Sequence, residues 1–222
     1  MTAPAQYILG SRSPRRKELL GLVVPPEQII VLPPANSGEA GFEGLHELSS
    51  IETRLIEIAR AKGTDVLQQI RAGALGFAPH PESVLITGDT TIAVLRPESG
   101  GSYLSLGQPP EDDTWTSVVR DWFQRYYAGQ THVVLSALLL QTLSGRETIR
   151  IVHTSVTFRR DVNRWLDWYL ASGEPRGKAG GYAIQGLGSI FVTRVEGSIT
   201  NVVGLPLEAL HGGLEDLHPT TS

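Results

Sequence analysis

The order of apolar and polar positions predicts short strands and a helix in the first part of the chain. Apolar runs over residues 7–9 and 28–32, each followed by turn-forming residues, are typical of buried strands. Between them, Ser13 and Pro14 have the order of a helix start, with serine as the N-cap and proline in the first turn. The leucines that follow would form the apolar face of this helix.

Apolar residues with helical spacing predict a longer helix from Ser49 to about residue 70. Ser49 and Glu52 have the spacing of a capping box at its start. One apolar face continues as far as Lys62, and it contains Ile51, Leu55 and Ile58. A lysine at the end of such a face either extends to solvent or reaches a buried anion, and the first case is the commoner one.

The second half of the chain alternates β-rich runs with aromatic helices. Two long runs, 131–140 and 148–158, are joined by Ser144 and Gly145 and predict an antiparallel pair. A polar tail is expected from about residue 211. The other predicted elements are strands at 84–87, 92–95, 103–106 and 190–195, helices at 115–127 and 161–170, and a short helix after 201–207.

Composition and charge restrict the possible functions. The 222 residues are 41% hydrophobic and 19% charged, which is typical of a globular protein, and no linker divides residues 1–222 into separate domains. A net charge of −4 argues against general binding to nucleic acids or membrane surfaces. The absence of cysteine excludes disulfides and thiolate chemistry. No apolar run has membrane-spanning length and no leader-like segment opens the sequence, so we expect a cytoplasmic protein.

Basic residues at the predicted helix start after Ser13 indicate an anion site. Arg15, Arg16 and Lys17 fall in the first turn, where the positive end of the helix dipole makes cations unfavourable. An anion would remove this conflict. The alternative is a solvated basic face, but the serine-rich loop that follows a strand favours phosphate.

Two further features point to a polar site. Asp89 lies between the apolar segments 84–87 and 92–95, where a carboxylate is costly to bury unless it is paired or bound to a metal. The alternative is an aspartate in a turn or cap, for which these runs leave little room. The segment 172–188 is rich in glycine beside Lys178 and Gln185, which suggests backbone that approaches a ligand, with a flexible loop as the alternative.

Four blocks of sequence occur in a distinctive order. They are Gly-Ser-Arg-Ser-Pro-Arg-Arg-Lys-Glu-Leu-Leu at 10–20, Ala-Arg-Ala-Lys at 59–62, Gly-Asp-Thr at 88–90, and a long C-terminal block. The last contains Ser-Gly-Glu-Pro at 172–175, Lys-Ala-Gly-Gly-Tyr-Ala-Ile-Gln-Gly at 178–186, Gly-Ser at 197–198 and Asn-Val-Val-Gly-Leu-Pro-Leu at 201–207. Together they resemble the Maf family of nucleoside triphosphate pyrophosphatases, also called septum-formation-inhibitor-like proteins.

The resemblance implies an architecture and an activity. The expected fold is α/β, with a central mixed β-sheet flanked by helices, and two lobes with a cleft, as a single Maf-like domain. The expected reaction is hydrolysis of a nucleoside triphosphate to the monophosphate and pyrophosphate, with a divalent metal, usually magnesium. The resemblance also implies a homodimer. A second hypothesis is a catalytically weakened relative that binds nucleotide and acts through a partner in cell-division control.

Site residues follow from the same resemblance, position by position. Ser11, Arg15 and Arg16 would hold phosphates, and Lys62 would add charge, which reverses the interpretation of that lysine in isolation. Asp89 matches the residue proposed as general base or metal-linked carboxylate. The remaining cleft positions are Lys178 and Gln185, with Gln185 next to the base or sugar.

Three positions distinguish this chain within the family pattern. The segment 33–40 lacks the family's usual Asp-Glu pair, for which Glu39 or Glu43 would substitute if the loop folds differently. Gln108 stands where the family usually has a lysine next to the phosphates. Gln185 resembles the branch that acts on thymidine and uridine triphosphates, whereas the 7-methylguanosine branch tends to carry glutamate there, so we expect a pyrimidine preference.

Overall fold

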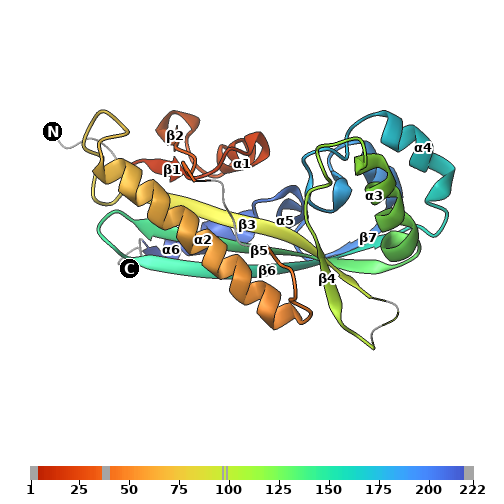
Figure 1. Ribbon diagram of the computed structural model, residues 1–222. Coiled ribbons are helices and arrows are strands. Elements are labelled where there is room, and N and C mark those ends of the chain that lie inside the picture. The colour runs from red at the N-terminus through yellow and green to blue at the C-terminus, as the bar shows by residue number, and fades with distance from the viewer. Residues whose placement is uncertain (1–4, 37–40, 97, 99, 218–222) are drawn as a thin grey trace.

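A mixed β-sheet runs the length of the molecule (Figure 1). The computed structural model describes residues 5–36, 41–96, 98 and 100–217. Within them the sheet has seven strands in the order β2-β1-β3-β5-β6-β7, with β4 paired to β3. The α/β class and the mixed sheet predicted from the sequence are confirmed. The strands are β1 (Tyr7–Leu9), β2 (Ile29–Val31), β3 (Val84–Leu95), β4 (Tyr103–Leu106), β5 (Thr131–Thr142), β6 (Glu147–Phe158) and β7 (Val192–Glu196).

One edge of β3 is paired with strands at both ends, and no strand among the described residues pairs with its middle. β1 pairs in parallel with residues 84–86, and β4 pairs antiparallel with residues 92–95. On the opposite edge, β5 pairs with β3 from Val84 to Ala93. The backbone of residues 87–91 therefore faces a break in the sheet on one side, and polar groups from elsewhere must satisfy it.

Helices cover both faces of the sheet around this break (Figure 1). α2 (Leu48–Arg71) packs Ile51, Leu55 and Ala59 on one face. The opposite face is covered by α1 (Pro14–Leu20), α5 (Ile199–Val203) and α6 (Leu207–Leu217). Because side chains alternate along a strand, successive residues of β3 point to α2 and to α1 in turn.

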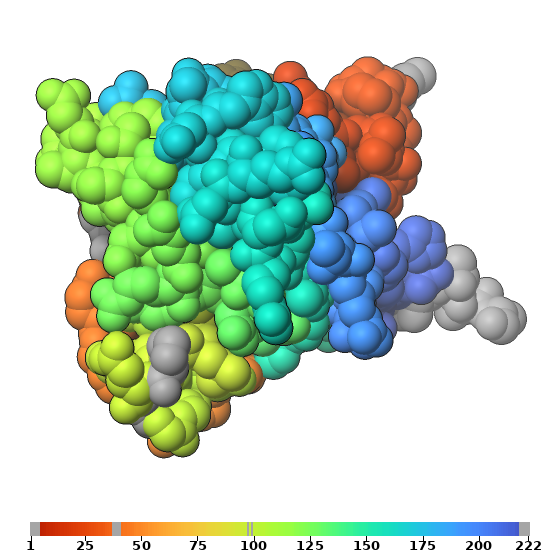
Figure 2. Space-filling model, turned by 90° about the vertical axis from the view of Figure 1, so that its right-hand side faces the viewer, coloured from red at the N-terminus to blue at the C-terminus, as the bar shows by residue number. Residues whose placement is uncertain are grey.

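An aromatic core lies at the other end of the sheet. α3 (Trp115–Trp122) and α4 (Asn163–Ala171) pack beside each other there, as the end-on view shows (Figure 2). A single π-helical turn, η2 (Phe123–Tyr127), continues α3, so the predicted helix at 115–127 changes its winding part-way. Edge-to-face and tilted ring pairs join the buried rings Phe123, Tyr127, Phe158, Tyr169 and Phe191.

Two local predictions are wrong. α2 begins at Leu48, before Ser49, and its N-cap Glu47 makes no side-chain hydrogen bond, so the expected capping box is not formed. The chain beyond residue 211 is not a polar tail as far as Leu217, because α6 extends to that residue and buries it. Arg146 donates a hydrogen bond to the Leu217 carbonyl oxygen, which holds the end of this helix against the sheet.

The other predicted strands and helices are present, but α5 is a helix where a turn was expected at the start of 201–207. The predicted strands 84–87 and 92–95 are two parts of the continuous strand β3. The final strand begins after a 3-10 helix, η4 (Leu187–Phe191), which takes up the first residues of the predicted run 190–195. No helix in the described part of the chain is both long and apolar enough to cross a bilayer.

Candidate active site

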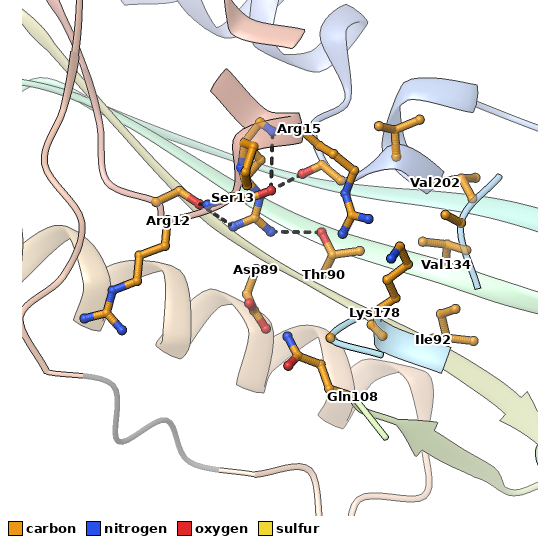
Figure 3. A pocket seen from close by; sticks show the side chains of 18 of the residues that line it. Arg12, Ser13, Arg15, Asp89, Thr90, Ile92, Gln108, Val134, Lys178 and Val202 are labelled. Carbon is orange, nitrogen blue, oxygen red and sulfur yellow. Dashed lines mark hydrogen bonds between the residues drawn. The ribbon is translucent and has the colours of Figure 1, made fainter. Parts of the chain in front are cut away.

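A cavity of about 460 Å³ opens at the break in the sheet. Its walls come from the loop before α1, the middle of β3, the end of α5 and the glycine-rich segment 177–185 (Figure 3). Lys62 of α2, Gln108 after β4, Val134 of β5, and Pro34 and Asn36 after β2 also line it. The sequence blocks predicted to form a site are far apart in the chain, and the fold brings all of them to this one cavity.

The described lining carries an excess of positive charge. Asp89 is the one carboxylate among these lining residues, whereas five basic side chains accompany it: Arg12, Arg15, Arg16, Lys62 and Lys178. The whole chain has a net charge of −4, so the cavity differs in sign from the average surface. A concave site with this charge concentrates anions. The arrangement therefore suits a polyanionic ligand such as a phosphate chain.

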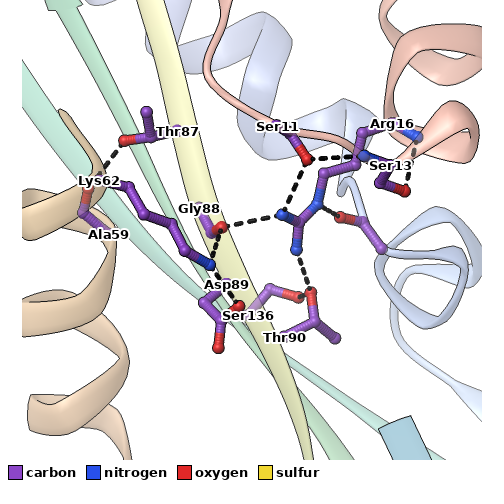
Figure 4. Close-up of polar contacts among 11 residues, drawn as sticks. Ser11, Ser13, Arg16, Ala59, Lys62, Thr87, Gly88, Asp89, Thr90 and Ser136 are labelled. Carbon is purple, nitrogen blue, oxygen red and sulfur yellow. Dashed lines mark hydrogen bonds and ion pairs between the residues drawn. The ribbon is translucent and has the colours of Figure 1, made fainter. Parts of the chain in front are cut away.

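Asp89 and Lys62 form an ion pair at the floor of the cavity (Figure 4). Lys62 Nζ lies 2.8 Å from Asp89 Oδ1, and the two side chains are 13% and 17% exposed. Thr87 donates a hydrogen bond of 2.8 Å to the Ala59 carbonyl oxygen, which ties α2 to β3 beside this pair. Lys62 thus reaches a carboxylate and does not extend to solvent, and Asp89 lies within a strand and not in a turn.

Arg16 satisfies the unpaired edge of β3 from the other face (Figure 4). Its Nη1 donates to the Gly88 carbonyl oxygen at 2.9 Å, and its Nη2 donates to Thr90 Oγ1 at 3.2 Å. Its Nε donates to the Gly204 carbonyl oxygen at 2.9 Å. The guanidinium therefore fastens α1 to β3 and to the end of α5. It lines the cavity, but most of its hydrogen-bonding capacity is used within the protein.

Ser11 belongs to the same internal network. Its side-chain oxygen accepts hydrogen bonds from Ser13 N–H at 3.2 Å and from Arg16 Nη1 at 3.4 Å, and the residue is 7% exposed. Ser13 caps α1 as predicted, accepting from Arg16 N–H. The serine-rich loop thus orders the start of α1, and the cavity is reached by only a small part of Ser11.

Arg15 differs from its neighbour Arg16. Its side chain extends toward Lys178 (Figure 3), and it makes no hydrogen bond or ion pair with the described residues. Lys178 Nζ donates to the Glu174 carbonyl oxygen at 2.7 Å. Burial is the main reason that the pKa of Lys178 is lowered, and the charge of Arg15 lowers that pKa further. A ligand with negative charge would relieve this repulsion.

Two amides complete the polar part of the cavity. Gln108 points from the segment after β4 toward Asp89 (Figure 3), and Gln185 lies in the glycine-rich segment. Both residues are exposed, and their side chains make no hydrogen bond with the described residues. Their amides can both donate and accept.

An apolar end of the cavity was not found from the sequence. Ile92, Val134 and Val202 line it beside Lys178 (Figure 3), and Tyr182 adds an aromatic ring. The hydroxyl of Tyr182 is turned away, 2.8 Å from the buried His132 Nε2. Apolar strand residues signal a core, so nothing in their pattern marked them as part of a site. This end suits an uncharged ring attached to a charged chain.

The comparisons with known proteins agree with these features. The model of the Maf family, described as Maf-like protein, matches residues 6–217. The chain belongs to the Maf family. A dTTP/UTP pyrophosphatase from Chelativorans sp. is 35% identical over 93% of this chain and 88% of its own length. Another from Deinococcus radiodurans is 36% identical over 93% of this chain and 89% of its own length. The family membership predicted from the motifs is confirmed.

The chain is also similar to solved structures. One of them is a nucleoside-triphosphatase / dITP/XTP pyrophosphatase from Mycobacterium abscessus, with a TM-score of 0.40 and 17% identity. The alignment covers 94% of this chain and 90% of that one.

The loop after β2 differs from the Maf pattern and is held in an unexpected way. Asp65 of α2 accepts hydrogen bonds from Ala35 N–H at 2.8 Å and from the Gln69 amide at 2.7 Å, and both contacts hold the pKa of Asp65 below its ordinary value. The sequence did not identify Asp65 as a residue that holds this loop, although it lies one turn after Lys62 on α2. Glu39 lies outside the described residues, and Glu43 does not line the cavity, so it does not replace the missing pair.

The donor set restricts how a metal ion could bind. The described residues contain no group of three or more His, Asp or Glu side chains suited to a metal ion. Magnesium keeps several waters and binds through one or two carboxylates together with substrate phosphates. Asp89 at a cavity rich in phosphate-binding cations fits that mode, whereas a site made by the protein alone does not fit the described residues.

Proposed function

We propose that this chain is a nucleoside triphosphate pyrophosphatase that cleaves between the α- and β-phosphates. The observation that carries the proposal is the Asp89–Lys62 pair at the floor of a strongly basic cavity. The Maf relatives named dTTP/UTP pyrophosphatase support the same reaction and a pyrimidine substrate. These names do not favour the second hypothesis, in which the chain is a catalytically weakened Maf-like protein that binds nucleotide and acts through a partner.

The groups on the cavity wall suit charge neutralisation more than covalent catalysis. Arg15 and Lys178 bind the phosphate chain, and Arg16 and Ser11 hold the loop against which it lies. Gln108 contacts the same chain as a neutral donor. Phosphoryl transfer depends chiefly on positioning and on stabilising charge that develops on the phosphate oxygens. Each of these residues lines the cavity, so all of them can act on one ligand.

Asp89 provides the basic group of the proposed reaction. Water attacks the α-phosphorus, and its proton passes to the Asp89 carboxylate. The bond from the α-phosphorus to the bridging oxygen breaks, and pyrophosphate leaves. Lys62, paired to the same carboxylate, keeps Asp89 oriented and adds positive charge. A magnesium ion held by Asp89 and the substrate phosphates would, when bound, neutralise phosphate charge.

The apolar end of the cavity accommodates the base, and Gln185 contacts its edge. An amide can pair with both donors and acceptors of a pyrimidine, whereas a carboxylate only accepts. We propose dTTP and UTP as the preferred substrates for this reason, together with the names of the relatives. On the family resemblance we also propose that the protein is a homodimer and is located in the cytoplasm. Light scattering, which measures the molar mass in solution, tests the homodimer.

Product analysis tests the proposed function. Purified protein is incubated with dTTP, UTP and 7-methylguanosine triphosphate, with and without magnesium, and the products are separated by anion exchange. The expected products are the monophosphate and pyrophosphate, formed only with magnesium and fastest from a pyrimidine. Release of inorganic phosphate and a diphosphate would contradict the proposal, and tight binding without turnover would support the weakened relative.

A further inference from the structure

The glycine-rich segment between α4 and η4 supplies much of the cavity wall without regular structure of its own. Only one 3-10 turn, η3 (Ala179–Gly181), interrupts it. Such a segment needs contacts elsewhere to hold a fixed shape, because ordering each residue opposes folding. Its residues that line the cavity are Gly177, Lys178, Ala179, Tyr182, Ala183, Ile184 and Gln185.

Glu174 closes this segment at its two ends. One carboxylate oxygen, Oε2, accepts a hydrogen bond from Leu187 N–H at 2.8 Å, and the other, Oε1, accepts from Gly188 N–H at 2.9 Å. Both N–H groups belong to the start of η4, where they have no partner within the helix. Every cavity residue of the segment lies between Glu174 and Leu187. The carboxylate therefore converts an open stretch of chain into a closed loop.

The same residue also contacts both sides of the loop. Its backbone carbonyl oxygen accepts from Lys178 Nζ at 2.7 Å, and its Oε1 accepts from the Tyr169 hydroxyl at 3.2 Å. A Cβ atom on Gly186 would lie 2.2 Å from Glu174 Oε2, so the close approach requires glycine at 186. Lys178 is thus held directly, and Gln185 is held through the neighbouring Gly186 and Leu187.

Buried tyrosines support the middle of the loop. The Tyr127 hydroxyl donates to the Gly180 carbonyl oxygen at 3.0 Å, and the Tyr169 hydroxyl shares its one proton between the Gly181 carbonyl oxygen at 3.3 Å and Glu174 Oε1. Tyr169 therefore contacts both the loop backbone and the Glu174 carboxylate. The aromatic core holds the loop's centre, while the ends depend on Glu174.

We propose that Glu174 is a positioning residue that sets Lys178 and Gln185 against the nucleotide. It lies outside the lining of the cavity and touches no substrate. Its carboxylate acts through the backbone N–H groups of η4, whereas Lys178 contacts its backbone carbonyl oxygen, which a substitution at 174 retains. The proposal rests on the proposed function in so far as the cavity binds a nucleoside triphosphate.

The test compares Glu174→Gln with the parent protein. Glutamine keeps the size but replaces one acceptor oxygen with an NH2 group, so one of the two N–H groups loses its acceptor. We expect the Kd for an α,β-imido analogue of dTTP to rise about tenfold. We expect kcat to fall less than threefold, and the ratio of kcat/KM between dTTP and dCTP to move toward one. Amide hydrogen exchange should accelerate within 176–188 and stay unchanged in β5.

Two further variants make the result decisive. Gly186→Ala displaces the carboxylate without removing it and should reproduce the same rise in Kd, so the test survives if Glu174→Gln does not fold. Glu215→Gln, on the exposed face of α6, removes one carboxylate away from the cavity and should match the parent in every measurement. Parental analogue affinity and parental loop exchange in both Glu174→Gln and Gly186→Ala would overturn the proposal.

Failure of this proposal is distinguishable from failure of the proposed function. If the parent protein does not bind the analogue, the proposed function is contradicted, while the exchange measurement still reports whether Glu174 fixes the loop. If the parent binds and hydrolyses dTTP but the two variants bind the analogue normally, only the role of Glu174 is contradicted.

Discussion

The two walls of the cavity differ in how their polar groups are held. On the β3 side, Arg16, Lys62 and Asp89 are bound to backbone atoms and to each other. On the opposite side, the side chains of Arg15 and Gln108 make no hydrogen bond with the described residues. The first wall is fixed before any ligand arrives. The second keeps its donors available, so we assign substrate contacts chiefly to it.

This difference explains why neighbouring arginines in one motif have different roles. Arg15 and Arg16 are adjacent in sequence and both line the cavity. Arg16 donates hydrogen bonds to Gly88 and Thr90 in the middle of β3, whereas Arg15 makes none with the described residues and its charge lowers the pKa of Lys178. Positive charge alone does not identify a ligand-binding residue, because a break in a sheet also recruits donors.

The largest expected effect is at the fixed wall. Asp89→Asn removes the proposed proton acceptor, and kcat should fall about a hundred- to ten-thousandfold. Steady-state kinetics with dTTP and magnesium measure this loss, and circular dichroism checks that the variant is folded. Asp113→Asn, an exposed carboxylate outside the cavity, serves as the control. Near-parental kcat in Asp89→Asn would show that this carboxylate is only structural.

Substitutions of the two arginines should separate an effect on substrate binding from an effect on protein stability. Arg15→Ala removes a donor available to phosphate, so KM should rise about ten- to a hundredfold with little change in melting temperature. Arg16→Ala removes the hydrogen bonds to the Gly88 and Gly204 carbonyl oxygens and should lower the free energy of unfolding by about 1–3 kcal/mol. Lys17→Ala removes an exposed cation of α1 that does not line the cavity, and should change neither quantity. Equal effects of Arg15→Ala and Arg16→Ala on both quantities would remove the distinction between the walls.

A charge added to the open wall should increase the rate. Gln108→Lys restores the cation that Maf enzymes usually place here, and a charge-assisted hydrogen bond is worth roughly 1.5–3 kcal/mol. If the contact strengthens in the transition state, kcat/KM with magnesium rises about ten- to a hundredfold. Gln130→Lys adds the same charge outside the cavity and controls for a general electrostatic effect on substrate association. The kinetics are measured at two salt concentrations. No gain, or an equal gain in analogue binding, would contradict a transition-state role.

The smallest expected effect concerns the base. Gln185→Glu leaves only acceptors at this position, so kcat/KM should fall about two- to tenfold for dTTP and rise for 7-methylguanosine triphosphate, by the loss or gain of one hydrogen bond. Gln130→Glu adds the same charge elsewhere and should leave the ratio between the two substrates unchanged. A parent enzyme that prefers 7-methylguanosine triphosphate would refute the assignment of Gln185.

Sequence patterns predicted the helices, the strands and the residues of the cavity better than they predicted which of these residues contact one another. Helical spacing placed Lys62 at the end of an apolar face, but only the register between α2 and β3 could show that it meets Asp89. The Ser-x-x-Glu pattern at Ser49 failed because packing of α2 on the sheet extended the helix by one residue. The polar composition after residue 211 hid Leu217, which α6 buries.

Some site residues had no signal in the sequence. Val134 has the pattern of an ordinary core residue of a strand, and it is 1% exposed, yet it lines the cavity. Glu174 belongs to the Ser-Gly-Glu-Pro motif at 172–175, yet its contacts with Leu187 and Gly188 depend on the path of the loop. Local patterns report on neighbours along the chain, whereas these roles arise from long-range packing.

Oxygen labelling tests the central claim most directly, namely that water attacks the α-phosphorus beside Asp89. The parent enzyme is run with dTTP and magnesium in ¹⁸O-enriched water, and both products are analysed by mass spectrometry. We expect one labelled oxygen in the thymidine monophosphate and none in the pyrophosphate. Label in the pyrophosphate would place the attack on the β-phosphorus and contradict the proposed mechanism.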